Sequence, residues 1–243
     1  MLRLLRRTRV EKGIEDPYTD LSGRLVTVLR PSAAASESYR VLRANLFYSV
    51  SDISPRVIAI TSPNPREGKS TTCANLAVVL AQAGKRTLLV DGDLRKPEVH
   101  KLFGLRNVYG LMNVLTGEQD LQAACHEPLK YLKVLTVGPI PLNPAEVLSS
   151  QLFADFLDQA RQQFDYVLVD TPPVQAVSDP AIVASLADGT FLVVDARKTR
   201  KRSVRQAMDR LGAVGASVIG TVFNNAKGSG GKNYAEPNYY AQD

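Results

Sequence analysis

The sequence has little that would form a metal cluster, a disulfide framework or a membrane span. It contains two cysteines and two histidines in 243 residues, and Cys73 and Cys125 lie too far apart for metal-ligand spacing. Sparse cysteine is typical of the reducing cytosol. No apolar run approaches the roughly 18 residues of a transmembrane helix. Residues 1–10 are basic but lack the apolar core of a signal peptide. We therefore expect a cytoplasmic protein.

Acidic residues are outnumbered, so the chain carries a net charge of +6. The excess is local, with four arginines in residues 1–9 and six basic residues in 197–205. Such patches attract nucleic acid or an anionic membrane surface. Aromatic residues do not alternate with the basic ones, so we expect no nucleic-acid partner. A solvated helix face explains the second patch better.

The segment Thr61–Thr71, with the sequence TSPNPREGKST, carries the most functional information. It follows the apolar run Val57–Ile60 and precedes a helical pattern. A strand, a tight loop ending in Gly-Lys-Ser and a helix form a phosphate-binding loop, because backbone N–H groups at a helix N-terminus face an anion. Gly68 lets the backbone approach the phosphate, Lys69 supplies charge for the β- and γ-phosphates, and the Ser70 hydroxyl can ligate Mg²⁺.

The loop departs from the usual pattern at its first position, where Pro63 replaces a glycine. Arg66 adds a side chain that would either crowd the phosphates or reach them as an extra cation. A Gly-Lys-Ser triplet also occurs by chance, so the loop alone is compatible with an ordinary strand–loop–helix junction.

Two further strand patterns end in aspartate and support a nucleotide site. The first runs from Leu88 into Asp91 and Asp93, and the second from Tyr166 into Asp170. Ligands of open parallel α/β sheets bind at the carboxyl ends of the strands, so these side chains should surround one crevice with Lys69 and Ser70. The alternative is that the aspartates are turn or helix N-cap residues. Three strand ends would then have to imitate a nucleotide–Mg²⁺ site together.

Hydrophobic periodicity predicts a doubly wound, mostly parallel α/β fold. The expected strands are rich in Val, Ile and Leu without polar alternation, which indicates a sheet buried on both faces. Leu25–Leu29 resembles a short strand, a helix follows from Pro31 to near Val50, and Gln151–Gln163 has an amphipathic helical pattern. The remaining expected strands are 57–61, 87–91, 132–136, 166–170, 190–195 and 217–223.

Three regions are expected along the chain: a flexible basic lead-in (1–24), one domain (25–226) and a flexible tail (227–243). Residues 227–233 have linker composition. Tyr234, Tyr239 and Tyr240 follow without hydrophobic partners at helical or strand spacing, which favours a disordered tail.

Together these motifs resemble the bacterial tyrosine autokinases of capsular and exopolysaccharide biosynthesis, of the cytoplasmic CpsD/CapB type. The resemblance covers residues 32–243 and rests on the phosphate loop, the Walker A′ segment Leu89–Pro97, the Walker B segment Val167–Pro173 and the tyrosine-bearing tail. It implies a P-loop NTPase fold of the MinD/ParA-like kind. Many relatives have glycine at the position of Arg66.

The resemblance also implies an ATP-dependent protein-tyrosine kinase that uses Mg²⁺ and phosphorylates its own tail. Asp91 and Asp93 would face the incoming tyrosine, with Asp91 orienting the hydroxyl and accepting its proton late. The expected residues are as follows: Lys69, Asp91 and Asp93 for catalysis; Glu67, Gly68, Lys69, Ser70, Thr71 and Asn224 for the nucleotide; Ser70, Asp93 and Asp170 for the metal; and Tyr234, Tyr239 and Tyr240 as phosphoacceptors.

The pattern Glu37-x-x-Arg40-x-x-Arg43 resembles the oligomerisation motif of the family. On a helix these residues cover an arc of about 120°, and local ion pairs worth a few tenths of a kcal/mol are the simpler explanation. The resemblance favours a head-to-tail contact that closes a ring. It also implies a membrane adaptor, or polysaccharide co-polymerase, whose cytoplasmic tail activates the kinase at the inner face of the plasma membrane.

Two other functions fit the same motifs. A partitioning or cell-division ATPase carries a second signature lysine five residues before the catalytic one, where this chain has Asn64. A non-catalytic assembly factor would use the nucleotide only to gate binding to a polysaccharide co-polymerase.

Overall fold

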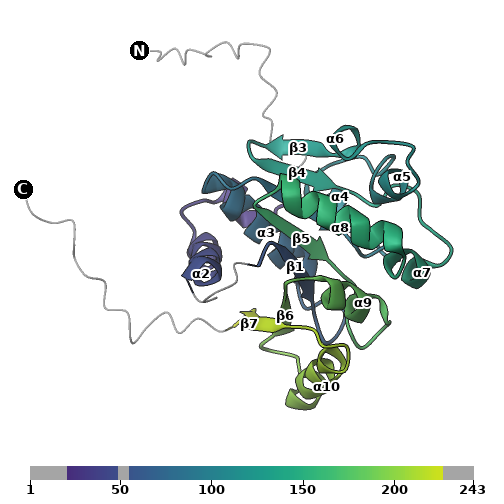
Figure 1. The fold of residues 1–243 in the computed structure, drawn as a ribbon. Helices are drawn as coiled ribbons and strands as arrows, with labels where there is room; N and C mark the ends of the chain where they lie inside the picture. Colours follow the sequence, from purple (N-terminus) through teal and green to yellow (C-terminus); the bar gives the residue numbers. More distant parts are fainter. Residues whose placement is uncertain (1–20, 49–54, 227–243) are drawn as a thin grey trace, which may run out of the picture.

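A seven-stranded sheet forms the centre of the protein (Figure 1). The computed structural model describes residues 21–48 and 55–226. The strand order is β3-β4-β2-β5-β1-β6-β7, and every neighbouring pair is parallel except β3 and β4. The strands are β1 (Val57–Thr61), β2 (Thr87–Asp91), β3 (His126–Leu129), β4 (Leu132–Leu135), β5 (Tyr166–Asp170), β6 (Gly189–Asp195) and β7 (Val218–Asn224).

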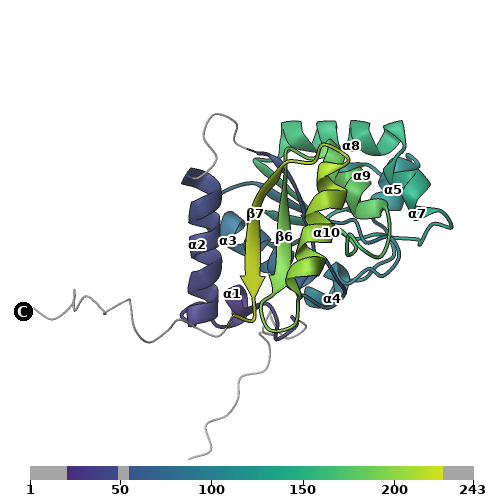
Figure 2. The same ribbon diagram turned by 90° about the horizontal axis from the view of Figure 1, so that it is seen from below.

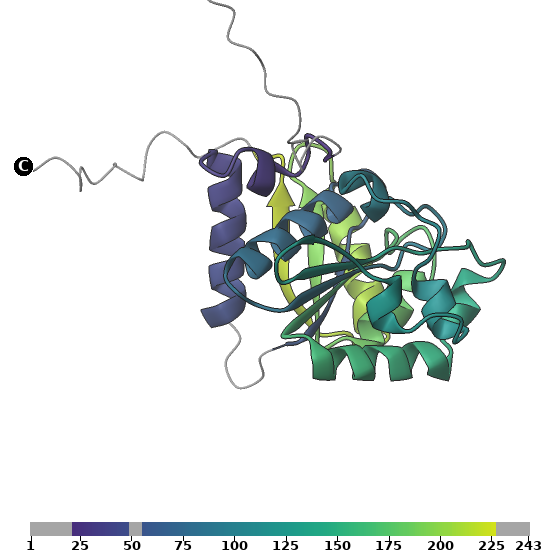
Figure 3. The same cartoon turned by 90° about the horizontal axis from the view of Figure 1, so that it is seen from above.

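Helices cover both faces of this sheet, which confirms the predicted doubly wound α/β fold (Figures 2 and 3). One face packs against the first four helices and the other against most of the remainder. The helices are α1 (Val26–Leu29), α2 (Ala34–Tyr48), α3 (Lys69–Gln82), α4 (Val99–Leu102), α5 (Leu111–Leu115), α6 (Leu121–Ala124), α7 (Pro144–Leu148), α8 (Gln151–Gln163), α9 (Asp179–Leu186) and α10 (Lys201–Gly212).

The central strand β1 shows why the strands appear as continuous apolar runs in the sequence. Val57 and Ala59 join the core beneath α8, α9 and α10, whereas Ile58 and Ile60 join the core beneath α3. Successive side chains of a strand point to opposite faces, so a strand covered on both faces must be apolar at every position.

One predicted element was wrong, and one strand of the sheet was not predicted. Residues 25–29 form no strand: Val26–Leu29 is the one-turn helix α1, because Thr27 bonds to a side chain of α3 and not to a sheet edge. The edge strand β3 was not predicted, since its sequence contains Pro128 and lacks apolar alternation. An antiparallel edge strand tolerates proline because one side of its ladder is unpaired.

The predicted domain boundary also shifts at the N-terminal side. Residues 21–24, expected in the flexible lead-in, contact the domain: Ser22 N donates to Leu102 O at 3.0 Å, and the Asn75 side chain donates to Arg24 O at 2.9 Å. The rest of the lead-in and the predicted tail lie outside the described residues.

Asn75 links this N-terminal segment to α3. Its side chain is fully buried and makes four hydrogen bonds. The Oδ1 atom accepts from the backbone N–H and the hydroxyl of Thr27, at 3.1 and 2.9 Å. The Nδ2 atom donates to Arg24 O and Thr71 O, at 2.9 and 2.8 Å. A buried polar group is tolerated when it is satisfied in this way.

We predict that Asn75→Ala lowers the free energy of unfolding by about 3 kcal/mol, since it leaves several buried polar groups without partners. Urea unfolding measures this change. Ser38→Ala is the control, because the Ser38 hydroxyl donates to the exposed Ala34 carbonyl within its own helix, and this variant should stay within about 0.5 kcal/mol of the parent. Equal effects of the two substitutions would contradict this role of Asn75.

Candidate active site

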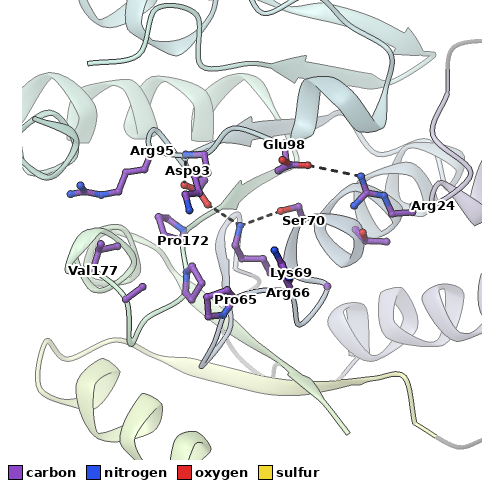
Figure 4. A pocket seen from close by; sticks show the side chains of 15 residues that line it. Arg24, Pro65, Arg66, Lys69, Ser70, Asp93, Arg95, Glu98, Pro172 and Val177 are labelled. Atoms are coloured by element: carbon purple, nitrogen blue, oxygen red, sulfur yellow. Dashed lines mark hydrogen bonds and ion pairs between the residues drawn. The ribbon is translucent and has the colours of Figure 1, made fainter. Parts of the chain in front are cut away.

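The carboxyl ends of β1, β2 and β5 meet at one lysine. Lys69 Nζ lies 3.1 Å from Asp93 Oδ2 and 3.1 Å from Ser70 Oγ (Figure 4). It also lies 3.5 Å from Asp170 Oδ2. β2 and β5 are adjacent parallel strands, with Asp91 paired in register with Asp170. The sheet therefore gathers the predicted residues at a single crevice.

The loop between β1 and α3 has left-handed backbone at two positions. Arg66 has φ +62° and Gly68 has φ +91°, so two residues adopt left-handed backbone on either side of Glu67. Alternating backbone conformations of this kind turn successive N–H groups toward one point and create an anion-binding nest. The helix α3 then begins at Lys69 and adds the positive end of its dipole.

Glu67 and Asn224, both expected at the nucleotide, hold this loop in the structure. The Glu67 carboxylate accepts hydrogen bonds from the backbone and side chain of Asn64 and from the Thr199 hydroxyl. Asn224 Nδ2, at the end of β7, donates to Glu67 O at 3.0 Å. Their side chains therefore fix the loop shape from outside, and neither residue lines the pocket.

Asp91 and Asp93 differ in their contacts and in whether they line the pocket. Asp91 is fully buried, and its two oxygens accept from the backbone N–H groups of Asp93, Glu98 and Val99 at 3.0–3.3 Å. It therefore shapes the segment after β2 and does not line the pocket. Asp93 is 6% exposed, lines the pocket and contacts Lys69.

Burial dominates the electrostatics of the carboxylates. Burial and the neighbouring Asp170 raise the pKa of Asp91 well above its usual range, against the hydrogen bond from Val99. Burial also raises the pKa of Asp170, while Lys69 opposes that change. For Lys69, burial disfavours the charge, but Asp170 and Asp93 outweigh burial and raise its pKa. Lys69 therefore remains a cation between carboxylates at neutral pH.

A pocket of about 720 Å³ opens in front of these groups (Figure 4). Pro172, Pro173, Ala176 and Val177 form an apolar wall on one side. Charged side chains surround the rest of the opening, and cations outnumber carboxylates among them. The charged residues that line the pocket are Arg24, Arg66, Lys69, Asp93, Arg95, Lys96 and Glu98.

Known proteins resemble this chain in both sequence and fold. A family model described as the NUBPL iron-transfer P-loop NTPase, of the ParA type, matches residues 54–240. The tyrosine-protein kinase YwqD of Bacillus subtilis is 42% identical over 217 residues, which are 89% of this chain and 90% of YwqD. This chain belongs to the bacterial tyrosine-protein kinases. The fold and the family resemblance predicted from the sequence are both confirmed.

Two solved structures superpose closely on this tyrosine-protein kinase chain. The kinase domain of the Escherichia coli tyrosine kinase ETK has a TM-score of 0.82 at 31% identity, over 92% of this chain and 87% of that one. The chimerical protein CapA2B2 has a TM-score of 0.79 at 37% identity, over 83% of this chain and 89% of the chimera.

The three residues of the expected oligomerisation motif make contacts within their own chain. Arg40 bonds to Glu37 at 2.7 Å and to Pro31 O at 2.6 Å, and Arg43 Nη1 donates to Val79 O at 2.9 Å. Glu37 nevertheless keeps 63% of its side chain exposed. The three expected phosphoacceptor tyrosines lie outside the described residues. No described helix has the length and apolar character needed to span a bilayer.

Sequence reasoning missed two contacts that shape the pocket. Arg95 bonds to the fully buried Asp179 at the start of α9, through Nε at 2.8 Å and Nη2 at 3.1 Å. Thr199 connects the segment after β6 to Glu67. Both contacts join residues more than 80 positions apart, and no local pattern in the sequence marks such pairs.

Gly68 is the position where the loop should tolerate a side chain least. A Cβ there would meet Asn224 Nδ2 at 2.0 Å, and the backbone has φ +91°. We predict that Gly68→Ala costs more than the roughly 1–2 kcal/mol of a left-handed residue alone, as measured by urea unfolding. Adding Asn224→Ala should restore only the part of the lost stability that comes from the collision with Asn224. Strictly additive effects in this double-mutant cycle would contradict the contact.

Proposed function

We propose that this chain is an ATP-dependent protein-tyrosine kinase that phosphorylates Tyr234, Tyr239 and Tyr240 of neighbouring copies of itself. The strongest support is the pocket, in which the phosphate loop lies beside a carboxylate and faces an apolar wall. A triphosphate fits the cationic side, and an aromatic ring fits the wall. An ATPase that transferred phosphate only to water would not need that wall.

The loop backbone and Lys69 bind the phosphates of ATP, and Ser70 and Thr71 at the start of α3 lie next to them. Ser70, Asp93 and Asp170 are the residues for Mg²⁺, since hydroxyl and carboxylate oxygens suit this hard cation. Asp170 Oδ1 fits this role, because it is buried without a hydrogen-bond partner among the described residues. When bound, Mg²⁺ neutralises charge on the phosphates.

The acceptor hydroxyl is placed by Asp93. The sequence favoured Asp91 for this task, but its side chain is fully buried and does not line the pocket, whereas Asp93 does. Both carboxylates accept hydrogen bonds from backbone N–H groups, so position distinguishes them. A free phenol has a pKa of about 10 and a free carboxylic acid about 4, so early proton transfer would cost roughly 8 kcal/mol. The proton therefore leaves late, and catalysis rests on positioning and charge neutralisation.

Transfer occurs between subunits of a ring. Glu37 of one chain meets Arg40 and Arg43 of the next, and the 63% exposure of Glu37 leaves it available for such a contact. A tail of 17 residues can extend at most ~60 Å, which suffices to reach a neighbouring pocket. Each phosphotyrosine adds a charge of about −1.5 to −2, so repulsion between modified tails loosens the ring.

The kinase acts in capsular or exopolysaccharide synthesis, together with a separate membrane adaptor whose cytoplasmic tail activates it. The support is the similarity to YwqD and to the CapA2B2 chimera. The adaptor keeps the kinase at the inner face of the plasma membrane. Basic residues among the first nine of the chain add weak attraction to anionic lipid.

Lys69→Met should abolish phosphorylation of the tail, because it removes the cation between Asp93 and Asp170. The measurement is incorporation of radioactive phosphate into purified protein, followed by mass spectrometry of the three tyrosines. Lys130→Met, on the turn between β3 and β4, is the control and should retain activity. A Lys69→Met protein that still labels itself, free of other kinases, would overturn the proposal.

Glu37→Ala combined with Arg40→Ala should convert the oligomer to a monomer in light scattering with size-exclusion chromatography. The matched control is Arg86→Ala with Asp165→Ala, which removes another exposed ion pair of 2.9 Å and should leave the mass unchanged. A monomeric parent protein, or an unchanged mass in the Glu37 and Arg40 variant, would contradict the ring.

A further inference from the structure

Arg66 adopts a backbone conformation that suits glycine better than arginine. Its φ of +62° lies in the left-handed region, which disfavours any residue with a Cβ. The loop requires this conformation, because it turns the N–H groups toward the anion site. Among the described residues, the Arg66 side chain makes no hydrogen bond or ion pair. Strain retained next to a binding site is a reason to ask what the side chain does.

The Arg66 side chain is exposed at the edge of the pocket, beside Lys69 and Ser70 (Figure 4). Within residues 21–48 and 55–226, no carboxylate lies within ion-pair distance of it. Three of the other four cations that line the pocket do have such partners: Arg24 faces Glu98 at 3.9 Å, Lys69 faces Asp93 at 3.1 Å, and Arg95 is held by Asp179 at 2.8 Å. Lys96 has no such partner among the described residues but does not belong to the phosphate loop.

The charge around Lys69 leaves a role for a second cation in the loop. One ammonium is shared by two carboxylates, Asp93 and Asp170, so these three side chains together carry excess negative charge. The Mg²⁺ proposed for Ser70, Asp93 and Asp170 would offset that charge, while Lys69 stays shared between the two carboxylates. Phosphoryl transfer is accelerated by cations that contact the transferred group, and an arginine suits phosphate because of its forked donors.

We propose that Arg66 is a catalytic residue whose guanidinium contacts the γ-phosphate of ATP from within the same chain. Its role in transfer rests on the kinase function proposed above. In that step a bond forms between the tyrosine oxygen and the γ-phosphorus, and the bond from that phosphorus to the β–γ bridging oxygen breaks. The electron pair stays on ADP, and the phenolic proton passes to Asp93. Arg66 stabilises the charge on the phosphoryl oxygens throughout.

This contact predicts opposite effects of an Arg66 substitution on ATP binding and on folding stability. ADP lacks the γ-phosphate, so loss of Arg66 should weaken ATP binding and leave ADP binding almost unchanged. Glycine relieves the left-handed strain, so Arg66→Gly should at the same time stabilise the folded protein. A variant that becomes more stable and discriminates less between ATP and ADP has lost a ligand contact and not its loop structure.

The experiment compares Arg66→Gly, Arg66→Lys and Tyr131→Gly with the parent protein. Tyr131 has φ +67° in the turn between β3 and β4, so its replacement relieves the same strain away from the pocket. Calorimetry gives the affinities for ADP and for a non-hydrolysable ATP analogue, both with Mg²⁺. Thermal unfolding gives stability, and single-turnover labelling gives the transfer rate.

We expect Arg66→Gly to raise the unfolding midpoint and to lower both the ATP-to-ADP affinity ratio and the transfer rate by about 10-fold. Arg66→Lys should recover part of both losses, and Tyr131→Gly should leave the affinity ratio at the parent value. An Arg66→Gly protein with the parent ratio and transfer rate would overturn the proposal.

The binding measurement keeps this inference separate from the kinase proposal. If the parent protein binds ATP but phosphorylates no tyrosine, the kinase function fails, while a 10-fold change in the affinity ratio still supports the Arg66 contact. If tyrosine transfer occurs but the ratio and rate do not depend on Arg66, only the Arg66 proposal fails.

Discussion

The shared ion pairs of Lys69 are the interaction on which the site depends. A single ammonium lies within 3.5 Å of carboxylates from the ends of β2 and β5, while its own backbone starts α3. Three separate parts of the chain therefore converge at one charge. Burial lowers the pKa of Lys69, but Asp170 and Asp93 outweigh burial and raise it. The result is a cation held in place before any phosphate arrives.

The sheet order explains why the loop keeps its shape beside this cation. β1 lies between β5 and β6, and β7 pairs with β6. Because these strands are parallel, the carboxyl ends of β6 and β7 lie at the same edge of the sheet as the phosphate loop that follows β1. Asn224 and Thr199 reach the loop from there and bond to Glu67. The left-handed residues at 66 and 68 are thus supported from outside, and the N–H groups they orient remain available to a ligand.

The fold and the polar residues at the strand ends were predictable because each rests on local patterns. Buried strands produce apolar runs, and the Gly-Lys-Ser triplet and the aspartates follow those runs directly. Long-range contacts decide the remainder. α1 forms because Thr27 bonds to Asn75. Asp91 accepts hydrogen bonds from the backbone N–H groups of Glu98 and Val99, and no sequence pattern predicts that this segment folds back onto β2. The left-handed backbone of Arg66 is likewise invisible in a sequence, because only glycine signals such a conformation.

The most direct test of a tyrosine kinase acting between subunits is a mixing experiment with two complementary full-length chains. The donor carries Phe at positions 234, 239 and 240, so it has an intact pocket and no acceptor in its tail. The acceptor carries Lys69→Met and an intact tail. Mass spectrometry after incubation with ATP and Mg²⁺ should find phosphotyrosine on the acceptor chain at those three positions. Absence of phosphotyrosine from the acceptor, when the parent chain alone labels its own tail, would contradict transfer between subunits.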